Sequence, residues 1–323
     1  MPLLSIVIPS FNRAALLQKA LASVGAQDLS DSEVIVVDDG STDETETIVR
    51  SCQFKIHFER QTRKGPGAAR NLGWTLARGD YIAFLDSDDV WFSWTLETYR
   101  DCISRYNHPK FVIGNYLRFE SDRELATVQR APLQARYYQD YLASAEEIIW
   151  MGSGGMLLRR DCQARFESKR MNAEDIDLAL HLGLEEGFAV IHQPFIFGYR
   201  HHGSNAIVNF DSTYRGVLHL IEEEKNNRFP GGAKRQRERV TLITRSTRPP
   251  TLEALRCRRP GSAFDIYRQT LAWNASLGKW KFILVFPILA VASLFRVRLE
   301  RIFLGVKSRG PERSLFSGST RLV

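Results

Sequence analysis

Residues 81–89 have the sequence YIAFLDSDD, in which an apolar run is followed by three aspartates within four positions. The run is rich in β-branched and aromatic residues and predicts a buried strand. Because an unpaired buried carboxylate is costly, we expect the aspartates at the mouth of that strand, facing water or a cation. Carboxylate oxygens with few His or Cys residues nearby suit Mg²⁺ or Mn²⁺, so this strand end is a candidate metal site. A solvated acidic loop is the alternative, and the surrounding sequence has to decide between the two.

Strands and helices alternate along the residues that precede this stretch. Three apolar runs predict strands, and the segments after them have the spacing or the capping residues of helices. The predicted strands are residues 4–9, 33–37 and 54–59, and the predicted helices cover 14–25, begin at 42, and cover 65–77. Such alternation predicts right-handed βαβ units and therefore an α/β fold with a mostly parallel sheet.

Polar loops follow the first, second and fourth of these strands, at residues 10–13, 38–41 and 86–89. In parallel sheets ligands bind at the carboxyl ends of the strands, so the three loops could converge on one crevice. Asp38 and Asp39 lie in the second loop. There they either belong to a turn before the next helix or accept hydrogen bonds from a nucleobase or a ribose.

Two glycine-rich segments lie near this crevice in the predicted topology. Residues 65–73, GPGAARNLG, are either an ordinary loop before a helix or a close approach of the backbone to a nucleotide. In the second case Arg70 is available to a phosphate or a base. Residues 152–155 precede another predicted strand, and the hypothesis for them is a wall of the acceptor site.

Further elements are predicted beyond the aspartates: a helix at 90–106, a strand at 110–119, a helix that begins near 174 and a strand at 189–192. Glu174 and Asp175 suit the start of their helix, where acidic side chains complement the helix dipole. His201 and His202 are the only adjacent histidines in the chain. An isolated pair of histidines more often lies on the surface without a function than it binds a metal.

Six segments follow one another in a distinctive order. They are SIVIPSFN at 5–12, VVDDGSTD at 36–43, GPGAARNLG at 65–73, GDYIAFLDSDD at 79–89, ED at 174–175 and YRHH at 199–202. Together they resemble the family 2 glycosyltransferases of GT-A fold, and the resemblance covers about residues 4–208. It implies that Pro9 and Asn12 line the nucleotide pocket, that Asp39 binds the base and that Arg70 lies close to it.

The resemblance also implies the roles of the later motifs. Asp86 and Asp88 match the Asp-x-Asp signature of the family, with Asp86 at the donor substrate and Asp88 as a direct ligand of Mn²⁺ or Mg²⁺. Glu174 and Asp175 match its Glu-Asp pair, with Glu174 at the substrate and Asp175 as the general base. His202 matches a histidine that binds the metal or the diphosphate in some members.

General chemistry supports such a site independently. Breaking a sugar–diphosphate bond places negative charge on the departing phosphate, which a divalent cation stabilises. A hydroxyl acceptor is a poor nucleophile until a base removes its proton, and one carboxylate opposite the leaving group suffices for inversion. Asp175 fits this base because it is distant in sequence from the metal cluster yet can return to the same crevice. We therefore expect an inverting, metal-dependent transfer from a nucleotide-diphosphate sugar, with UDP implied by the resemblance alone.

The composition, 323 residues with 44% hydrophobic and 25% charged, is that of a globular protein. We expect a glycosyltransferase domain at 1–210, with a nucleotide-sugar half at 1–90 and an acceptor half at 91–210, and a helical basic extension at 211–323.

The four cysteines have no metal-binding spacing and are interpreted as reduced, in a cytosolic setting. Residues 3–8 fit a first strand better than a signal peptide.

The net charge of +7 is uneven, since residues 228–259 carry ten Lys or Arg against two Glu, and 296–323 carry seven against two. This predicts an anionic partner, and the lack of aromatic interleaving favours a membrane surface over nucleic acid. Residues 282–295 carry no charge, but a spanning helix needs about 20 residues and Pro287 interrupts this one. They form either a buried core helix or an interfacial segment. Basic residues on both sides favour the interface: Lys279, Lys281, Arg296, Arg298 and Arg301.

The leading interpretation is transfer to a hydroxyl of a glycan or lipid-linked acceptor in the assembly of a surface polysaccharide or glycolipid. The expected location is peripheral, at the inner face of the plasma membrane. One alternative is a sugar-phosphate nucleotidylyltransferase, which would need a glycine-rich basic loop that residues 10–13 do not supply. Another is an inactive, membrane-docked scaffold, against which the presence of both Asp88 and Asp175 argues.

Overall fold

The computed structural model describes residues 2–149, 151–169, 171–203 and 209–304, with side chains as far as residue 294. The chain divides into two compact units. The first consists of Met1–His202 with Asn227–Glu238, and the second of Gly203–Asn226 with Arg239–Val323. The return of residues 227–238 to the first unit is a feature that the sequence did not predict.

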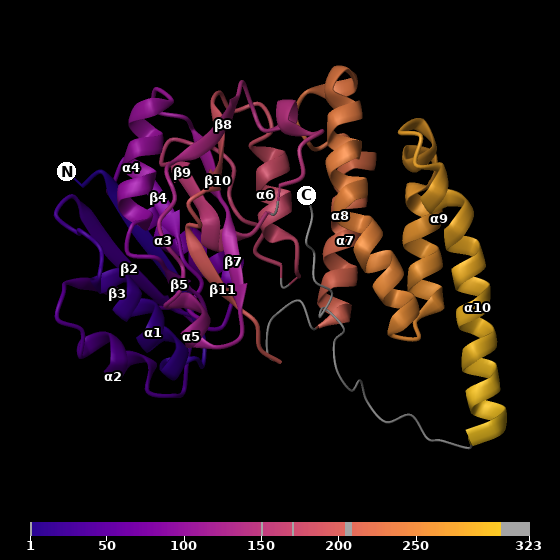
Figure 1. The fold of residues 1–323 in the computed structure, drawn as a ribbon, viewed down its shortest axis with the longest axis horizontal. Coiled ribbons are helices and arrows are strands. Elements are labelled where there is room, and N and C mark those ends of the chain that lie inside the picture. Colours follow the sequence, from indigo (N-terminus) through magenta and orange to yellow (C-terminus); the bar gives the residue numbers. More distant parts are fainter. Residues whose placement is uncertain (1, 150, 170, 204–208, 305–323) are drawn as a thin grey trace. The chain divides into compact units, whose positions relative to one another are not determined.

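An eight-stranded sheet, within the described residues, forms the centre of the first unit (Figure 1). The strand order is β3-β2-β1-β4-β9-β6-β10-β8, and all strands except β9 and β8 run parallel. The strands are β1 (Leu4–Ser10), β2 (Ser32–Asp38), β3 (Ile56–Arg60), β4 (Tyr81–Phe84), β6 (Phe111–Gly114), β8 (Gln134–Tyr138), β9 (Met156–Arg159) and β10 (Phe188–Gln193). The predicted α/β fold with a mostly parallel sheet is confirmed.

The central strands explain the unbroken apolar runs of the sequence. Every residue of β1 and of β4 is buried, as in parallel sheets that helices cover on both faces. α3 packs against β1 and β2, beginning with Pro66 in its first turn, where a missing N–H costs nothing. The helices of the first unit are α1 (Ala14–Gly25), α2 (Thr45–Arg50), α3 (Pro66–Leu76), α4 (Thr95–Arg105), α5 (Asp122–Leu125) and α6 (Glu174–His181).

A second, three-stranded sheet in the described part of this unit has the order β5-β11-β7, from Val90–Trp91, Phe197–Arg200 and Tyr116–Phe119. It corrects two predictions. The helix expected at 90–106 begins only at Thr95, because residues 90–91 pair with β11. The strand expected at 110–119 is two strands, separated at Asn115, whose N–H donates to Ile191 O and whose carbonyl accepts from Ile196 N–H.

Four helices account for most of the described second unit: α7 (Phe210–Lys225), α8 (Gln236–Arg256, which begins in the first unit), α9 (Pro260–Ser276) and α10 (Trp280–Leu304). α9 packs against α7 and α10. The Tyr267 hydroxyl donates to Ile283 O at 2.9 Å, and the Tyr267 and Phe286 rings stack with centroids 4.4 Å apart. Arg239 and Glu224 form a buried ion pair, with Nε and Oε2 2.7 Å apart.

α8 was not predicted as a helix, because Pro249 and Pro250 lie inside it. Side chains bond carbonyls near the interruption: Arg248 Nε donates to Thr244 O at 3.1 Å and Thr251 Oγ1 to Thr247 O at 2.7 Å. α10 extends the apolar segment predicted at 282–295. Among the helices that the structure describes, none combines the length and the apolar character needed to cross a membrane.

Candidate active site

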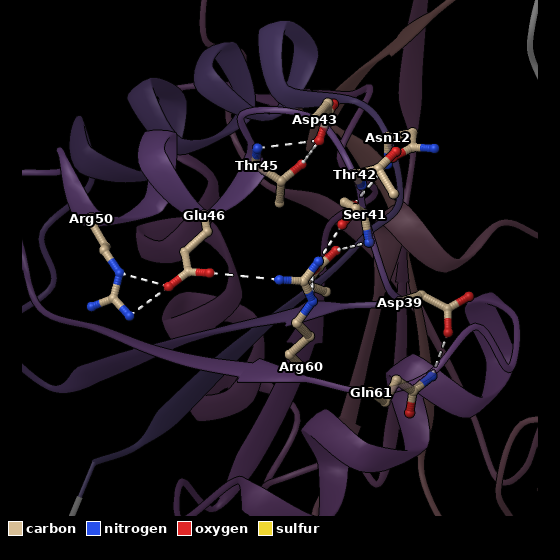
Figure 2. A network of polar contacts seen from close by, with 11 residues as sticks. Asn12, Asp39, Ser41, Thr42, Asp43, Thr45, Glu46, Arg50, Arg60 and Gln61 are labelled. Atoms are coloured by element: carbon tan, nitrogen blue, oxygen red, sulfur yellow. Dashed lines mark hydrogen bonds and ion pairs between the residues drawn. The ribbon is translucent and has the colours of Figure 1, made fainter.

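Side-chain hydrogen bonds tie together the loops that follow β1 and β2 (Figure 2). Ser10 ends β1, Asp38 ends β2, and the two residues are paired in the sheet. Asn12 has a positive φ of 50°, its backbone N–H donates to Ser41 Oγ at 2.8 Å, and its Oδ1 accepts from Thr42 N–H at 2.8 Å. Asn adopts this left-handed conformation more readily than most residues. Asn12 therefore shapes both loops.

Pro9 lies in β1 opposite Val37 of β2, beyond Val7, where the pairing of β1 with β4 ends. A proline is tolerated at such a place because no hydrogen bond to a flanking strand is lost there. The ring of Pro9 is buried at the carboxyl end of β1.

Asp39 organises the loop that follows β3. Its Oδ1 accepts from Gln61 Nε2 (Figure 2) and from Lys64 N–H, both at 2.7 Å, and its Oδ2 accepts from Gly65 N–H at 2.8 Å. The residue is 5% exposed. Three of the roughly four acceptor positions of the carboxylate are thus used within the protein.

Arg70 connects the Asp-x-Asp segment with the start of α6. Its Nη2 lies 2.6 Å from Asp86 Oδ1 and its Nη1 lies 3.2 Å from Glu174 Oε1. Ser153 Oγ donates to Asp86 Oδ2 at 3.0 Å, so Asp86 is held from two sides. Arg70 is only 5% exposed. The buried guanidinium of Arg70 thus lies between the carboxylates of Asp86 and Glu174.

Asp88 has two basic neighbours, Arg13 and His202. The Arg13 guanidinium forms an ion pair with Asp88 Oδ2, and His202 Nε2 lies 3.1 Å from the same oxygen. Burial alone would raise the pKa of Asp88, but the hydrogen bond from His202 and the charge of Arg13 outweigh it and hold the pKa below its ordinary value. Asp88 is therefore an anion near neutral pH.

Asp89 is a different kind of carboxyl group. It is buried and accepts the backbone N–H of Arg200 at 2.9 Å. Burial, followed by the charges of Asp88 and Asp86, raises its pKa well above the ordinary value. The third aspartate of the sequence stretch thus joins β11 to the end of β4.

Asp175 lies in the first turn of α6, and its Oδ1 accepts the N–H of Ile176 at 2.8 Å. Burial is the main cause that raises the pKa of this carboxyl to about 7, and the negative charge of Glu174 adds to the effect. Arg70 acts in the opposite direction. A carboxyl that titrates near pH 7 can take up and release a proton under physiological conditions.

No group of three or more His, Cys, Asp or Glu side chains that could hold a metal ion is present in the described parts of the chain. The donor chemistry nevertheless fits a divalent cation at Asp88. A carboxylate oxygen and an imidazole nitrogen converge there, and a cation bound to that oxygen would have to displace the Arg13 guanidinium that now pairs with it. Oxygen and imidazole donors are suitable for Mn²⁺.

The structure brings the expected residues into two groups. Asp86, Arg70, Glu174 and Asp175 form one cluster, and Asp88 and His202 form the neighbouring one. Pro9, Asn12 and Asp39 lie at the ends of β1 and β2. Arg13 and Ser153 were not named individually, although the segments 10–13 and 152–155 that contain them were expected at the site. Glycine neighbours marked the segment of Ser153, but nothing marked the contact of its hydroxyl with Asp86.

Comparison with known proteins identifies the family of the chain. The model of the family "Glycosyl transferase family 2" matches residues 5–162. The GalNAc(5)-diNAcBac-PP-undecaprenol beta-1,3-glucosyltransferase of Campylobacter jejuni is 40% identical over 236 residues, which cover 70% of this chain and 74% of that protein.

Two solved structures share the fold. TarS 1-349 of S. aureus in complex with UDP-GlcNAc is 17% identical with a TM-score of 0.54, over 86% of this chain and 92% of that one. The mannosyltransferase PcManGT of Pyrobaculum calidifontis in complex with GDP-Man and Mn²⁺ is 16% identical with a TM-score of 0.53, over 94% and 87%. The chain therefore belongs to glycosyl transferase family 2, has the GT-A fold and is a glycosyltransferase.

Proposed function

We propose that this protein transfers a sugar, with inversion, from a nucleotide-diphosphate sugar to a hydroxyl group of a lipid-linked glycan. The observation that carries the proposal is the bridge through Arg70, whose guanidinium contacts both Asp86 and Glu174. It links the Asp-x-Asp segment with the helix of Asp175, so that donor and base belong to one site.

On the donor side, the loops after β1 and β2 bind the nucleoside. Asp39 is oriented by the residues 61–65, and its remaining acceptor position would receive an N–H of the base. Pro9 and Asn12 line the same pocket. The UDP-GlcNAc complex of TarS and the lipid-linked substrate in the name of the Campylobacter protein support a UDP-sugar and a lipid-linked acceptor.

On the leaving-group side, Asp88 and His202 would hold Mn²⁺ or Mg²⁺, which supplies positive charge to the departing diphosphate. Arg13 lies on the same carboxylate oxygen and is a second source of positive charge. Asp86 is kept in place by Arg70 and Ser153. The Mn²⁺ complex of PcManGT supports the use of a divalent cation in this fold.

On the acceptor side, Asp175 removes the proton of the attacking hydroxyl. Its raised pKa, about 7, makes the carboxylate a stronger base than an ordinary aspartate while leaving it largely ionised above neutral pH. Glu174 remains paired with Arg70 and assists by keeping the start of α6 fixed. The residues 91–210 would receive the acceptor and the residues 1–90 the donor.

The helical, basic residues 211–323 would keep the enzyme at an anionic membrane, at the inner face of the plasma membrane. Support comes from the apolar side chains that α10 exposes and from the basic residues around them. This location would give the transferase access to a lipid-linked acceptor.

A panel of nucleotide sugars tests the proposal directly. The purified chain is incubated with each sugar and Mn²⁺, with or without EDTA, and hydrolysis of the donor is measured in the absence of an acceptor. We expect hydrolysis of one UDP-sugar, its loss with EDTA and its recovery with added Mn²⁺. Lack of turnover with every donor would contradict the proposal and favour the inactive scaffold.

A further inference from the structure

A cavity of about 420 Å³ lies in the second unit, between the second half of α8 and the first turns of α10. Its wall is mainly apolar and includes Leu252 on α8 and Phe282, Val285 and Leu289 on α10. Neither the sheet of the first unit nor the residues of the proposed active site take part in it.

Three cations line the same cavity: Arg248 on α8, and Lys279 and Lys281 at the start of α10. Arg248 Nε donates to Thr244 O, and burial together with the charge of Arg245 lowers the pKa of Arg248. Among the side chains that the structure describes, no carboxylate forms an ion pair with Arg248, Lys279 or Lys281. An anion is therefore the complement that this end of the cavity requires.

An apolar face continues from the cavity along α10. Trp280, Leu284, Ile288 and Val291 recur at helical spacing and are between 51% and 68% exposed. A soluble surface rarely exposes so many large apolar side chains together unless it is an interaction site. The occupant of this region must therefore combine a negative group with hydrocarbon.

We propose that the cavity binds an anionic phospholipid of a bilayer, with the phosphate among Arg248, Lys279 and Lys281 and one acyl chain against the apolar wall. The exposed face of α10 then lies in the interfacial layer of the membrane. The proposal deepens the membrane association proposed above and does not depend on the sugar-transfer chemistry.

Charge distinguishes this occupant from two others. Residues 239–323 carry sixteen Lys or Arg against four Asp or Glu, so a second copy of the chain would bring the same positive charge to the face. The segment 305–323 carries four Lys or Arg against one Glu and is no better a partner for a cationic cavity. A phosphate-rich lipid surface complements both the cations and the hydrocarbon.

Flotation of the full-length chain with vesicles tests the proposal. One set of vesicles is phosphatidylcholine alone, and the other contains phosphatidylglycerol as well. We expect binding to the anionic vesicles, weakened about 30-fold or more by Lys279→Glu with Lys281→Glu. The matched control, Lys225→Glu with Arg268→Glu, changes the charge of the same unit equally and should leave most of the binding intact.

A second pair of variants tests the apolar face. Leu284→Asp with Ile288→Asp should weaken vesicle binding, whereas Leu184→Asp, an exposed position of the first unit, should not. Donor hydrolysis without an acceptor and thermal unfolding, measured on each preparation, separate failure of the fold or of the transferase from failure of lipid binding. Equal binding by the lysine variant and its control would overturn the proposal. Failure of the parent chain to bind anionic vesicles would also overturn the proposal. This includes the case in which the exposed face of α10 instead forms a dimer of the chain.

Discussion

The end of β4 and the start of α6 hold the two carboxylates of the proposed site, Asp88 and Asp175, in opposite environments. Asp88 contacts Arg13 and His202, which outweigh the effect of burial and lower its pKa. Asp175 is affected mainly by burial and by its neighbour Glu174, which raise its pKa to about 7. Arg70 lies between the two regions, paired with Asp86 and Glu174.

This difference separates two roles that the sequence could assign only by resemblance. A carboxylate kept ionised by neighbouring cations suits the binding of a divalent metal ion, which could in turn bind a diphosphate. One with a pKa raised to near 7 suits proton transfer, and pairs of groups with divergent pKa values commonly mark acid–base assignments. The predictions below test whether Asp88 and Asp175 have these two different roles. They are ordered from the largest expected effect to the smallest.

Replacement of the base has the largest expected effect. Asp175→Asn removes the proton acceptor and should lower kcat about 1,000-fold, while donor binding stays within a few fold of the parent. Kinetics and donor titration measure the two quantities. Asp177→Asn is the matched control on the same helix, since Asp177 faces His181 at 3.7 Å and should alter kcat only a few fold. Near-parent turnover by Asp175→Asn would remove this residue from the mechanism.

Replacement of Asp88 should act through the cation. Asp88→Asn should lower kcat about 100-fold and abolish the rise in melting temperature on addition of Mn²⁺. Asp175→Asn should keep that rise. Asp80→Asn, an exposed change at the other end of β4, is the control. If Asp88→Asn retained the full response to Mn²⁺, the metal would bind elsewhere.

Arg70 should matter for stability as well as for catalysis. Arg70→Met leaves Asp86 and Glu174 without their common partner, which should destabilise the protein by about 3 kcal/mol. Because Arg70 also lowers the pKa of Asp175, the variant should need a higher pH for activity than the parent. Denaturant unfolding and a pH profile measure these effects. Arg78→Met, which removes a largely exposed arginine from its pair with Glu33, should cost less than about 1 kcal/mol. Equal costs for the two variants would contradict a special role of the bridge.

The smallest effect is expected for Ser153. Ser153→Ala removes one donor to Asp86 but leaves Arg70 in place, so kcat/KM should fall less than about tenfold. Steady-state kinetics with the donor measure it. A larger loss, at unchanged stability, would indicate that the Ser153 hydroxyl contacts the substrate itself.

The sequence predicted the first unit well where local pattern and tertiary environment agree. The residues 4–10 and 81–84 are mostly apolar and are buried throughout, because both faces of their strands are covered. Predictions failed where a distant partner decides. Residues 90–91 form a strand only because β11 pairs with them, and 110–119 is divided at Asn115 by contacts with residues 191 and 196.

In the site, the motif residues could be named in advance, but their partners could not. The contacts of Arg13 with Asp88 and of Ser153 with Asp86 join segments that are far apart in the sequence and carry no local signal. Arg70 is paired with two carboxylates, which the sequence did not predict, and its expected position close to the base stays a prediction. α8 was not predicted because it contains Pro249 and Pro250. Hydrogen bonds from side chains to backbone carbonyls help to stabilise the helix near these prolines.

The pH dependence of kcat/KM, compared between the parent chain and Asp175→Asn, tests the central claim most directly. Since the pKa of Asp175 is raised to about 7, the carboxylate form appears as the pH rises through that value. The parent profile should therefore rise to a plateau with a midpoint near pH 7, and the residual activity of Asp175→Asn should lack this limb. A parent profile that is flat from pH 5 to 8, or a limb that persists in Asp175→Asn, would contradict the assignment of Asp175 as the base.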